Sequence, residues 1–196
     1  MAAQHFPLTS VADYLDHEEL SPTKHWYYAG LVTAMAEGSP GHAFLAMNLG
    51  GELRNGLRGK KCRVAGSDLL LQTGRKEMYV YPDVMVICGP VEAMEGRPNV
   101  VTNPVFVAEV LLPSTAEDDR GAKSHEYRAT PSVRQFALIS QTRPLVEIHT
   151  RNEDGSWLLT EVMGLEADCA FSSLECSVPM AALYEGVLDL VGSGSE

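Results

Sequence analysis

Apolar residues along this chain follow both helical and strand-like spacings, and this mixture predicts an α/β protein. In the segment 42–57 a leucine recurs at every fourth position, which places four leucines on one face of a helix. Helices are also expected over residues 10–19, over residues 116–129 and as a short stretch within residues 178–190. The first of these begins with a serine–acid pair that resembles a capping box.

Runs of β-branched and other apolar residues predict the strands. The expected strands cover residues 62–72, 79–87, 104–111, 135–140, 145–151 and 157–162, with a strand or hairpin over residues 26–35. The run at 104–111 is apolar on both faces apart from one acid, which is typical of a central strand. The intervening segment 89–103 is expected to be a surface loop. The pattern therefore predicts one mixed α/β domain.

Length and composition fit this prediction, because 196 residues with 45% hydrophobic side chains can bury a core without metal or disulfide support. No repeat and no linker divides the chain. We expect an N-terminal helical extension at residues 1–20, a single domain at residues 21–190 and a flexible tail at residues 191–196.

The charge balance narrows the possible functions. A formal net charge of -11 argues against a general nucleic-acid coat, because affinity for DNA rests on neutralisation of phosphates by Lys and Arg. It does not exclude a nuclease, since the basic residues are unevenly spread. Five of them lie within ten positions, at Arg54, Arg58, Lys60, Lys61 and Arg63.

The cysteine spacing and the N-terminal sequence indicate the cellular compartment. Four cysteines, Cys62, Cys88, Cys169 and Cys176, form no CxxC pair and no zinc-type spacing. Cys62 and Cys88 lie in apolar runs and are expected to be small buried hydrophobic residues. The N-terminus lacks the basic and apolar regions of a signal peptide, and no apolar run approaches the roughly 18 residues of a membrane helix. We therefore expect a reduced, cytoplasmic protein without membrane contact.

Two acids placed inside apolar strands are the candidate chemistry. Asp83 and Glu109 each interrupt such a run, and a lone desolvated carboxylate is costly, so each must be paired, protonated or bound to a cation. Lys123 follows Glu109 by fourteen positions and shares a helix face with Tyr127. Mg²⁺ is usually held by one or two carboxylates together with substrate phosphate oxygens. Asp83 and Glu109 are therefore predicted metal ligands, and the pattern indicates phosphodiester cleavage.

Each residue also has a structural interpretation when it is taken alone. Asp83 follows a proline and is typical of a turn or strand edge, Glu109 is a possible buried partner of an arginine, and Lys123 is typical of a solvated helix face. His42 begins a helix after a glycine-rich turn, where capping, a phosphate contact or simple exposure are all open. The joint pattern favours the functional interpretation. The sequence has no Gly-rich phosphate loop and no GxSxG elbow, so NTPase and α/β-hydrolase activities lack support.

A series of motifs runs in one order from about residue 21 to residue 184: Ala34-Met35, Gly38-Ser39-Pro40-Gly41-His42, Cys62-Arg63-Val64, Tyr81-Pro82-Asp83-Val84-Met85-Val86, Glu109-Val110-Leu111, Pro113-Ser114-Thr115, Asp119, Lys123 and Tyr127. The series resembles the Uma-type putative restriction endonuclease family, a branch of the PD-(D/E)XK nuclease superfamily. The resemblance implies a restriction-endonuclease-like mixed β-sheet core flanked by helices, with an extra C-terminal β-meander. The domain at residues 21–190 would then be nuclease-like.

The resemblance also implies an activity, which is Mg²⁺-dependent (or Mn²⁺-dependent) hydrolysis of DNA phosphodiester bonds. Asp83 takes the place of the first acid of the superfamily motif and Glu109 that of the second, so both would be catalytic metal ligands. Lys123 takes the place of the lysine, which has moved to the following helix. His42 and Tyr127 would be auxiliary catalytic residues. Many such nucleases act as homodimers in which each protomer cuts one strand.

Two departures from the family pattern keep alternatives open. Ala29 and Leu31 flank Gly30 in the early strand, where many relatives carry an acid, and Leu112 stands where a serine often precedes the Pro-Ser-Thr motif. The altered early strand and the acidic composition favour a non-catalytic interaction or regulatory protein on a nuclease scaffold. A hydrolase of small phosphoesters is a third possibility, for which negative charge is less of a handicap.

Overall fold

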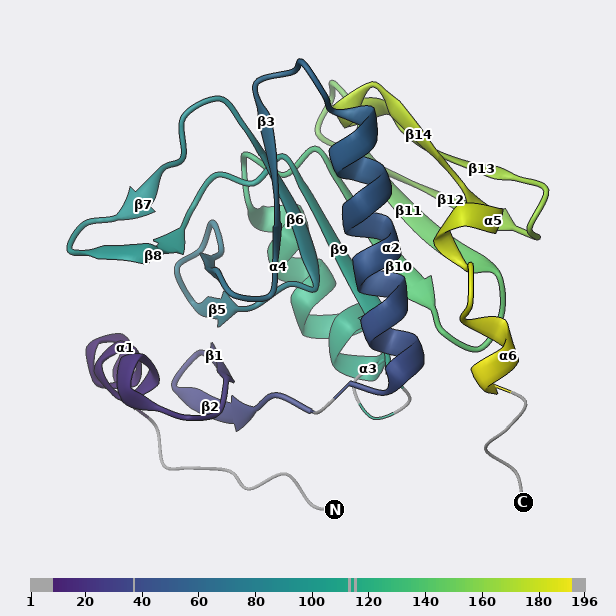
Figure 1. Cartoon of the computed structure of the whole chain (residues 1–196). Helices are drawn as coiled ribbons and strands as arrows, with labels where there is room; N and C mark the ends of the chain where they lie inside the picture. The colour runs from purple at the N-terminus through teal and green to yellow at the C-terminus, as the bar shows by residue number, and fades with distance from the viewer. Residues whose placement is uncertain (1–8, 37, 113, 115, 192–196) are drawn as a thin grey trace.

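Two six-stranded β-sheets and a two-stranded ribbon form the protein, with helices packed against them (Figure 1). The computed structural model describes residues 9–36, 38–112, 114 and 116–191. The segment 1–8, Pro113 and Thr115 of the motif series, and nearly all of the predicted tail lie outside the described residues.

The strands are β1 (His25–Tyr28), β2 (Leu31–Ala34), β3 (Cys62–Gly66), β4 (Leu70–Gln72), β5 (Met78–Val80), β6 (Val84–Cys88), β7 (Ala93–Met94), β8 (Arg97–Val101), β9 (Phe106–Leu111), β10 (Gln135–Ser140), β11 (Leu145–Arg151), β12 (Trp157–Met163), β13 (Asp168–Phe171) and β14 (Cys176–Pro179). The helices are α1 (Val11–Leu20), α2 (Pro40–Gly56), α3 (Ala116–Asp118), α4 (Ser124–Ala129), α5 (Met180–Leu183) and α6 (Leu188–Val191). A π-helical turn (Asp119–Lys123) joins α3 to α4, and a 3₁₀ turn (Ser172–Leu174) precedes β14.

The main sheet has the strand order β12-β11-β10-β9-β6-β3 and carries the candidate residues. Strands β9 and β10 run parallel, whereas the other neighbours are antiparallel, so the sheet is mixed. The run β10–β11–β12 is the predicted C-terminal meander. Helix α2 covers one face and the α3–α4 segment covers the other (Figure 1). The predicted mixed core flanked by helices is confirmed.

Helix α2 forms where the leucine spacing predicts it. Ser39 caps its start by accepting a hydrogen bond from the His42 backbone N–H, and Pro40 occupies the first turn, where its missing N–H costs nothing. The leucine stripe packs against β6 and β9 residues that include Val86 and Phe106. This packing fixes the position of His42 relative to the main sheet.

The second sheet has the order β2-β1-β5-β4-β8-β7 and packs against α1. The predicted hairpin around Gly30 is present, and both Ala29 and Gly30 have positive φ at its turn. Tyr14 of α1 packs against Tyr27 and Tyr79 of this sheet. The division into an extension at residues 1–20 and a domain from residue 21 stays a prediction.

Four predicted segments were wrong in extent. The expected strands 62–72 and 79–87 each divide into two short strands that belong to different sheets, because each run bends at a turn; in the second run, Pro82 has no N–H to donate to a ladder. The expected loop 89–103 contains the β7–β8 hairpin, in which Val100 and Val101 are buried. The expected helix 116–129 is interrupted by the π-helical turn.

The expectation of free, buried Cys62 and Cys88 was also wrong, because a disulfide joins the two residues across the β3–β6 pair. Cys169 and Cys176 are free. Sequence analysis missed the β13–β14 ribbon, which packs Cys169 and Val178 into the core on the α2 side. Among the described residues, no helix has both the length and the apolar character needed to cross a bilayer.

Candidate active site

The pairing of β6 with β9 brings the two predicted acids together. Val84 lies opposite Ala108 and Met85 opposite Val107, so continuing this register places Asp83, just before β6, across from Glu109. Side chains alternate between the faces of a strand, and Met85 and Val107 pack into the core on the α4 side. Asp83 and Glu109 therefore project toward the same face of the sheet.

Asp83 is held from two directions. Its Oδ2 accepts a hydrogen bond of 2.7 Å from the backbone N–H of Val110, and the Nε2 of His42 lies 3.1 Å from the same oxygen. Burial lowers the pKa of His42, but the hydrogen bond to Asp83 and the charge of Asp83 outweigh this effect, so the pKa of His42 is raised. His42 thus reaches the sheet from the start of α2 and fixes the Asp83 carboxylate.

Glu109 is almost completely buried, with 3% of its surface exposed. Its Oε1 accepts a hydrogen bond from the Tyr127 hydroxyl and lies 3.4 Å from the Nζ of Lys123. Burial raises the pKa of Glu109 to about 8 against the opposing pull of Lys123, and the negative charges of Asp119 and Asp83 add to the rise. Burial, with the Glu109 charge, also raises the pKa of Tyr127, which therefore remains a hydrogen-bond donor.

Lys123 is buried between two acids rather than solvated, with 6% of its surface exposed. Its Nζ lies 2.7 Å from Asp119 Oδ1 and 3.4 Å from Glu109 Oε1. Burial alone would lower the pKa of Lys123, but the charges of Glu109 and Asp119 outweigh it and raise that pKa. The ammonium group therefore stays charged, and the partner of Glu109 is this lysine rather than an arginine.

Asp119 is the residue that sequence analysis missed as part of the site. It is 2% exposed and begins the π-helical turn that ends at Lys123, so the two residues form an i,i+4 ion pair. Its position in the motif series and its spacing of four from Lys123 were the available signals.

These side chains surround a cavity of about 200 Å³. The cavity is lined in part by His42, Asp83, Glu109, Asp119 and Lys123, which come from α2, the start of β6, β9 and the π-helical turn. Tyr127 is fully buried and contacts Glu109 outside this lining. The structure thus brings four of the five predicted site residues to one cavity and places the fifth behind them.

A family match covers the part of the chain that contains these site residues. The profile of the Uma2 family, whose description is "putative restriction endonuclease", matches residues 11–179. The chain belongs to the Uma2 family. This confirms the family resemblance seen in the sequence.

Two Synechocystis sp. proteins are similar to this Uma2 protein along most of their length. The uncharacterized protein slr1290 is 32% identical over 93% of this chain and 94% of its own length. The uncharacterized protein sll1609 is 34% identical over 86% of this chain and 95% of its own length.

A crystal structure from Anabaena variabilis, titled as a putative nuclease belonging to DUF820, has the same fold. Its TM-score is 0.71, with 13% sequence identity, and the match covers 90% of this chain and 97% of the other. At this identity the similarity establishes the fold alone.

The donor set of the Uma2 site suits a hard divalent cation. Two carboxylates on one face of the sheet border the same cavity, and carboxylate oxygen is the ligand that Mg²⁺ prefers. A carboxyl whose pKa is raised by burial gives up its proton when a cation binds, so cation binding and ionisation of Glu109 would be linked. Asp83 and Glu109 therefore fit the predicted role of metal ligands.

Replacing Glu109 by glutamine is expected to stabilise the metal-free protein increasingly as the pH rises. The folded-state pKa of about 8 lies above the usual 4.5, so the folded wild type binds more protons than the unfolded chain and loses stability between these values, by up to about 1.4 kcal/mol per pH unit. Glutamine keeps the shape without the charge. Denaturant unfolding with EDTA from pH 5 to pH 9 measures the difference, and a variant less stable than wild type at every pH would instead identify Glu109 as a stabilising ion-pair partner.

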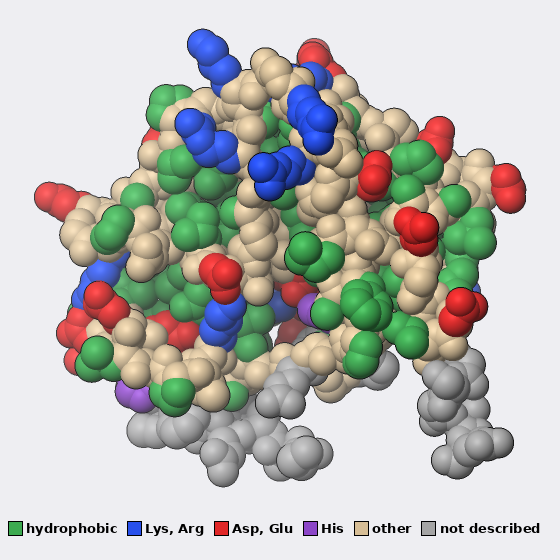
Figure 2. Space-filling view, viewed as in Figure 1, with side chains coloured by type: hydrophobic (Ala, Val, Ile, Leu, Met, Phe, Trp, Pro, Cys, Tyr) green, Lys and Arg blue, Asp and Glu red, His purple; other side chains and the backbone are tan. Residues whose placement is uncertain are grey.

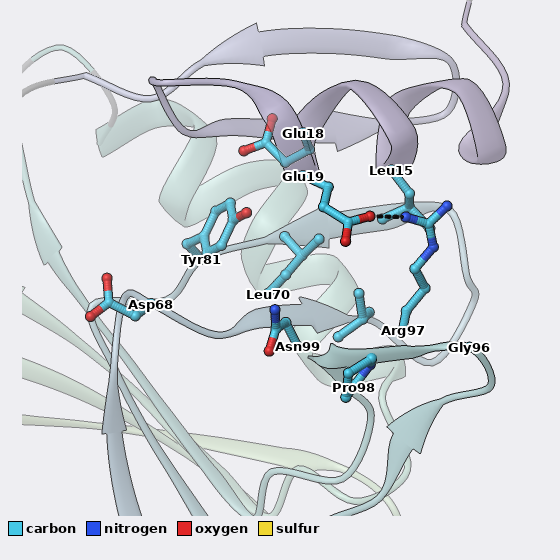
Figure 3. Close-up of a pocket in the computed structure, with 11 residues that line it drawn as sticks. Leu15, Glu18, Glu19, Asp68, Leu70, Tyr81, Gly96, Arg97, Pro98 and Asn99 are labelled. Carbon is cyan, nitrogen blue, oxygen red and sulfur yellow. Dashed lines mark hydrogen bonds and ion pairs between the residues drawn. The ribbon is translucent and has the colours of Figure 1, made fainter.

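A second group of possible ligands lies on α1 and β1, where atoms of His17, Glu18 and His25 fall within 4.8 Å of one another. Glu18 already accepts a 2.8 Å hydrogen bond from the His25 backbone N–H, and its other oxygen lies 2.9 Å from His25 Nδ1. The adjacent cavity of about 250 Å³ is lined in part by Arg97, which pairs with Glu19 (Figure 3). These contacts tie α1 to the second sheet and give the group a structural role.

Proposed function

We propose that this Uma2 protein is a Mg²⁺-dependent or Mn²⁺-dependent endonuclease that hydrolyses DNA phosphodiester bonds. The convergence of Asp83, Glu109 and Lys123 on one cavity is the observation that carries the proposal. Membership of a family described as putative restriction endonucleases supports it. So does the shared fold with a protein titled as a putative nuclease.

In this proposal Asp83 and Glu109 hold the cation. A bound ion would neutralise charge on the scissile phosphate and would lower the pKa of the attacking water. The backbone N–H of Val110 and the ring of His42 orient Asp83, whereas the hydroxyl of Tyr127 orients Glu109. These contacts fix both carboxylates before substrate arrives, as pre-organised catalysis requires.

Lys123 supplies the positive charge beside the two acids. Its raised pKa keeps it protonated near neutral pH, so it can donate to a phosphate oxygen or to the attacking water, and it stabilises the negative charge that builds up during cleavage. Asp119 acts as a positioning residue, since its 2.7 Å ion pair holds the ammonium group beside Glu109.

Cleavage assays test this proposal. Purified protein is incubated with supercoiled plasmid and, separately, with a chromogenic phosphodiester, in Mg²⁺, Mn²⁺ or EDTA. We expect plasmid nicking that requires the metal. Hydrolysis of the small ester alone would indicate a phosphoesterase for small substrates, and no hydrolysis with either metal would indicate a non-catalytic scaffold.

The proposal includes action as a homodimer, which allows both strands of a duplex to be cut. Strand β12 lies at the outer edge of the main sheet, and Leu158, Leu159 and Met163 on it are at least half exposed. An exposed edge strand with apolar side chains is suited to pairing with another chain. We expect sedimentation of a dimer that Leu159→Lys dissociates, and a monomeric wild type at micromolar concentration would remove this part of the proposal.

A further inference from the structure

A larger cleft opens from the candidate active site and runs between α2 and β3. Its volume is about 790 Å³, and it shares His42 and Asp83 with the smaller cavity. Arg54, near the end of α2, lines it as well. The cleft therefore connects the predicted catalytic groups to the basic segment that was noted in the sequence.

Small residues of α2 form one wall of this cleft. It is the side of the helix that turns away from the leucine stripe, and small residues such as Ala46, Gly50 and Gly51 line it. A Cβ atom added at Gly50 or Gly51 would meet no heavy atom within 4 Å. The opposite wall includes the β3 residues Val64 to Gly66. The two glycines therefore leave open space along the α2 wall.

A basic cluster lies where α2 ends and β3 begins, made up of Arg54, Arg58, Lys60, Lys61 and Arg63, of which Arg54 lines the cleft. Figure 2 shows Lys and Arg side chains gathered at the top of the view, where Figure 1 places the end of α2 and the start of β3. Among the described residues, the side chains of Arg54 and Lys61 have no hydrogen-bond or ion-pair partner. In a chain with a net charge of -11, this cluster is a local concentration of positive charge.

The length of the cleft indicates a polymeric anion. Arg54 follows His42 by twelve residues of one helix, which at about 1.5 Å per residue corresponds to about 18 Å. One strand of duplex DNA carries a phosphate about every 3.4 Å of helix axis, and the phosphates lie farther apart along the winding strand itself, so this length spans a few successive phosphates. The residues lining the cleft include no Phe, Tyr or Trp, so no platform for stacking unpaired bases is present within this lining.

We propose that the cleft between α2 and β3 binds the sugar-phosphate backbone of one strand of duplex DNA, and that the basic cluster directs this strand to Asp83. The inference rests on the proposed function and specifies the substrate as a duplex that is contacted through phosphates. Phosphate contacts position a protein on DNA without reading its sequence. Binding at the cleft is therefore strongly salt-dependent and independent of sequence.

Binding without cleavage tests the inference separately from catalysis. The anisotropy of a fluorescent 20-base-pair duplex is titrated with protein in EDTA at several salt concentrations. The double variant Arg54→Ala/Lys61→Ala is expected to bind at least about tenfold more weakly and to reduce the slope of log K against log salt by about two. The matched control Arg75→Ala/Lys76→Ala removes the same charge from the exposed β4–β5 turn and is expected to bind as the wild type does.

Steric variants test the path of the strand. Gly50→Leu and Gly51→Leu fill open space and replace glycine with a better helix former, so we expect thermal stability to be retained while duplex affinity falls at least about fivefold. Wild-type affinity in both the charge and the steric variants would overturn the inference. Tighter binding of single-stranded DNA or of RNA, with the same sensitivity to the variants, would overturn its assignment to duplex DNA. If the wild type does not cleave DNA but the charge and steric variants still lose duplex affinity, the inference about the cleft is supported and only the proposed catalysis is rejected.

Discussion

Asp83→Asn is expected to lower metal-dependent plasmid cleavage by at least about 100-fold while the protein stays folded. Asparagine has nearly the same shape as aspartate, and its side-chain oxygen can still accept the hydrogen bond from the Val110 N–H. The substitution removes the negative charge of the Asp83 carboxylate, which is proposed to bind the cation. The expected loss is therefore in cation binding and turnover, with the register of β6 against β9 retained.

Plasmid nicking and calorimetric titration with Mn²⁺ measure the two parts of this effect, and circular dichroism checks the fold. Asp168→Asn is the matched control, because Asp168 is exposed on β13 and lines neither the small cavity nor the large cleft. We expect Asp168→Asn to cleave at the wild-type rate. Full activity and unchanged Mn²⁺ affinity in Asp83→Asn would remove Asp83 from the site.

The parts of the fold that sequence analysis predicted well are those in which one local pattern decides the structure. The leucine spacing of α2 has a single solution, a helix with one buried face, and the structure has that helix. The run around Glu109 is apolar on both faces, and β9 is indeed fully buried between β10 and β6. In both cases the information lies within a few neighbouring residues.

The parts that were mispredicted depend on partners distant in the sequence. An apolar run does not state which sheet it joins, so β3–β4 and β5–β6 were each interpreted as one strand although they belong to separate sheets. The Cys62–Cys88 pair arises from the β3–β6 register over a separation of 26 residues. Val100 and Val101 lie in a mostly polar segment, where their burial could not be inferred from periodicity.

The candidate site was predictable to the same limited extent. The acids at 83 and 109 stand out because carboxylates inside strands are costly, but their facing positions follow from the register alone. Asp119 follows two other acids, Glu117 and Asp118, and such a run is typical of a solvated helix start. Its burial beside Lys123 comes from the π-helical turn, which spacing does not predict.

Lys123→Ala is expected to abolish cleavage and also to destabilise the fold by about 3–5 kcal/mol. A lysine on a solvated helix face could be removed without this cost. Here its removal leaves the buried carboxyls of Glu109 and Asp119 without their shared cation. Unfolding in urea at pH 8 measures the stability, and plasmid nicking below the unfolding temperature measures the activity.

A double variant separates the two roles of Lys123. Adding Glu109→Gln removes one of the two carboxyls that lose their shared cation, so Lys123→Ala/Glu109→Gln is expected to regain part of the lost stability, most at high pH where Glu109 ionises, while remaining inactive. Lys123→Arg, which keeps a positive charge between the same acids, is expected to stay closest to wild-type stability. Lys123→Ala with wild-type stability would show that the two acids tolerate burial unpaired. Lys123→Ala with wild-type cleavage would place the catalytic cation elsewhere on the chain.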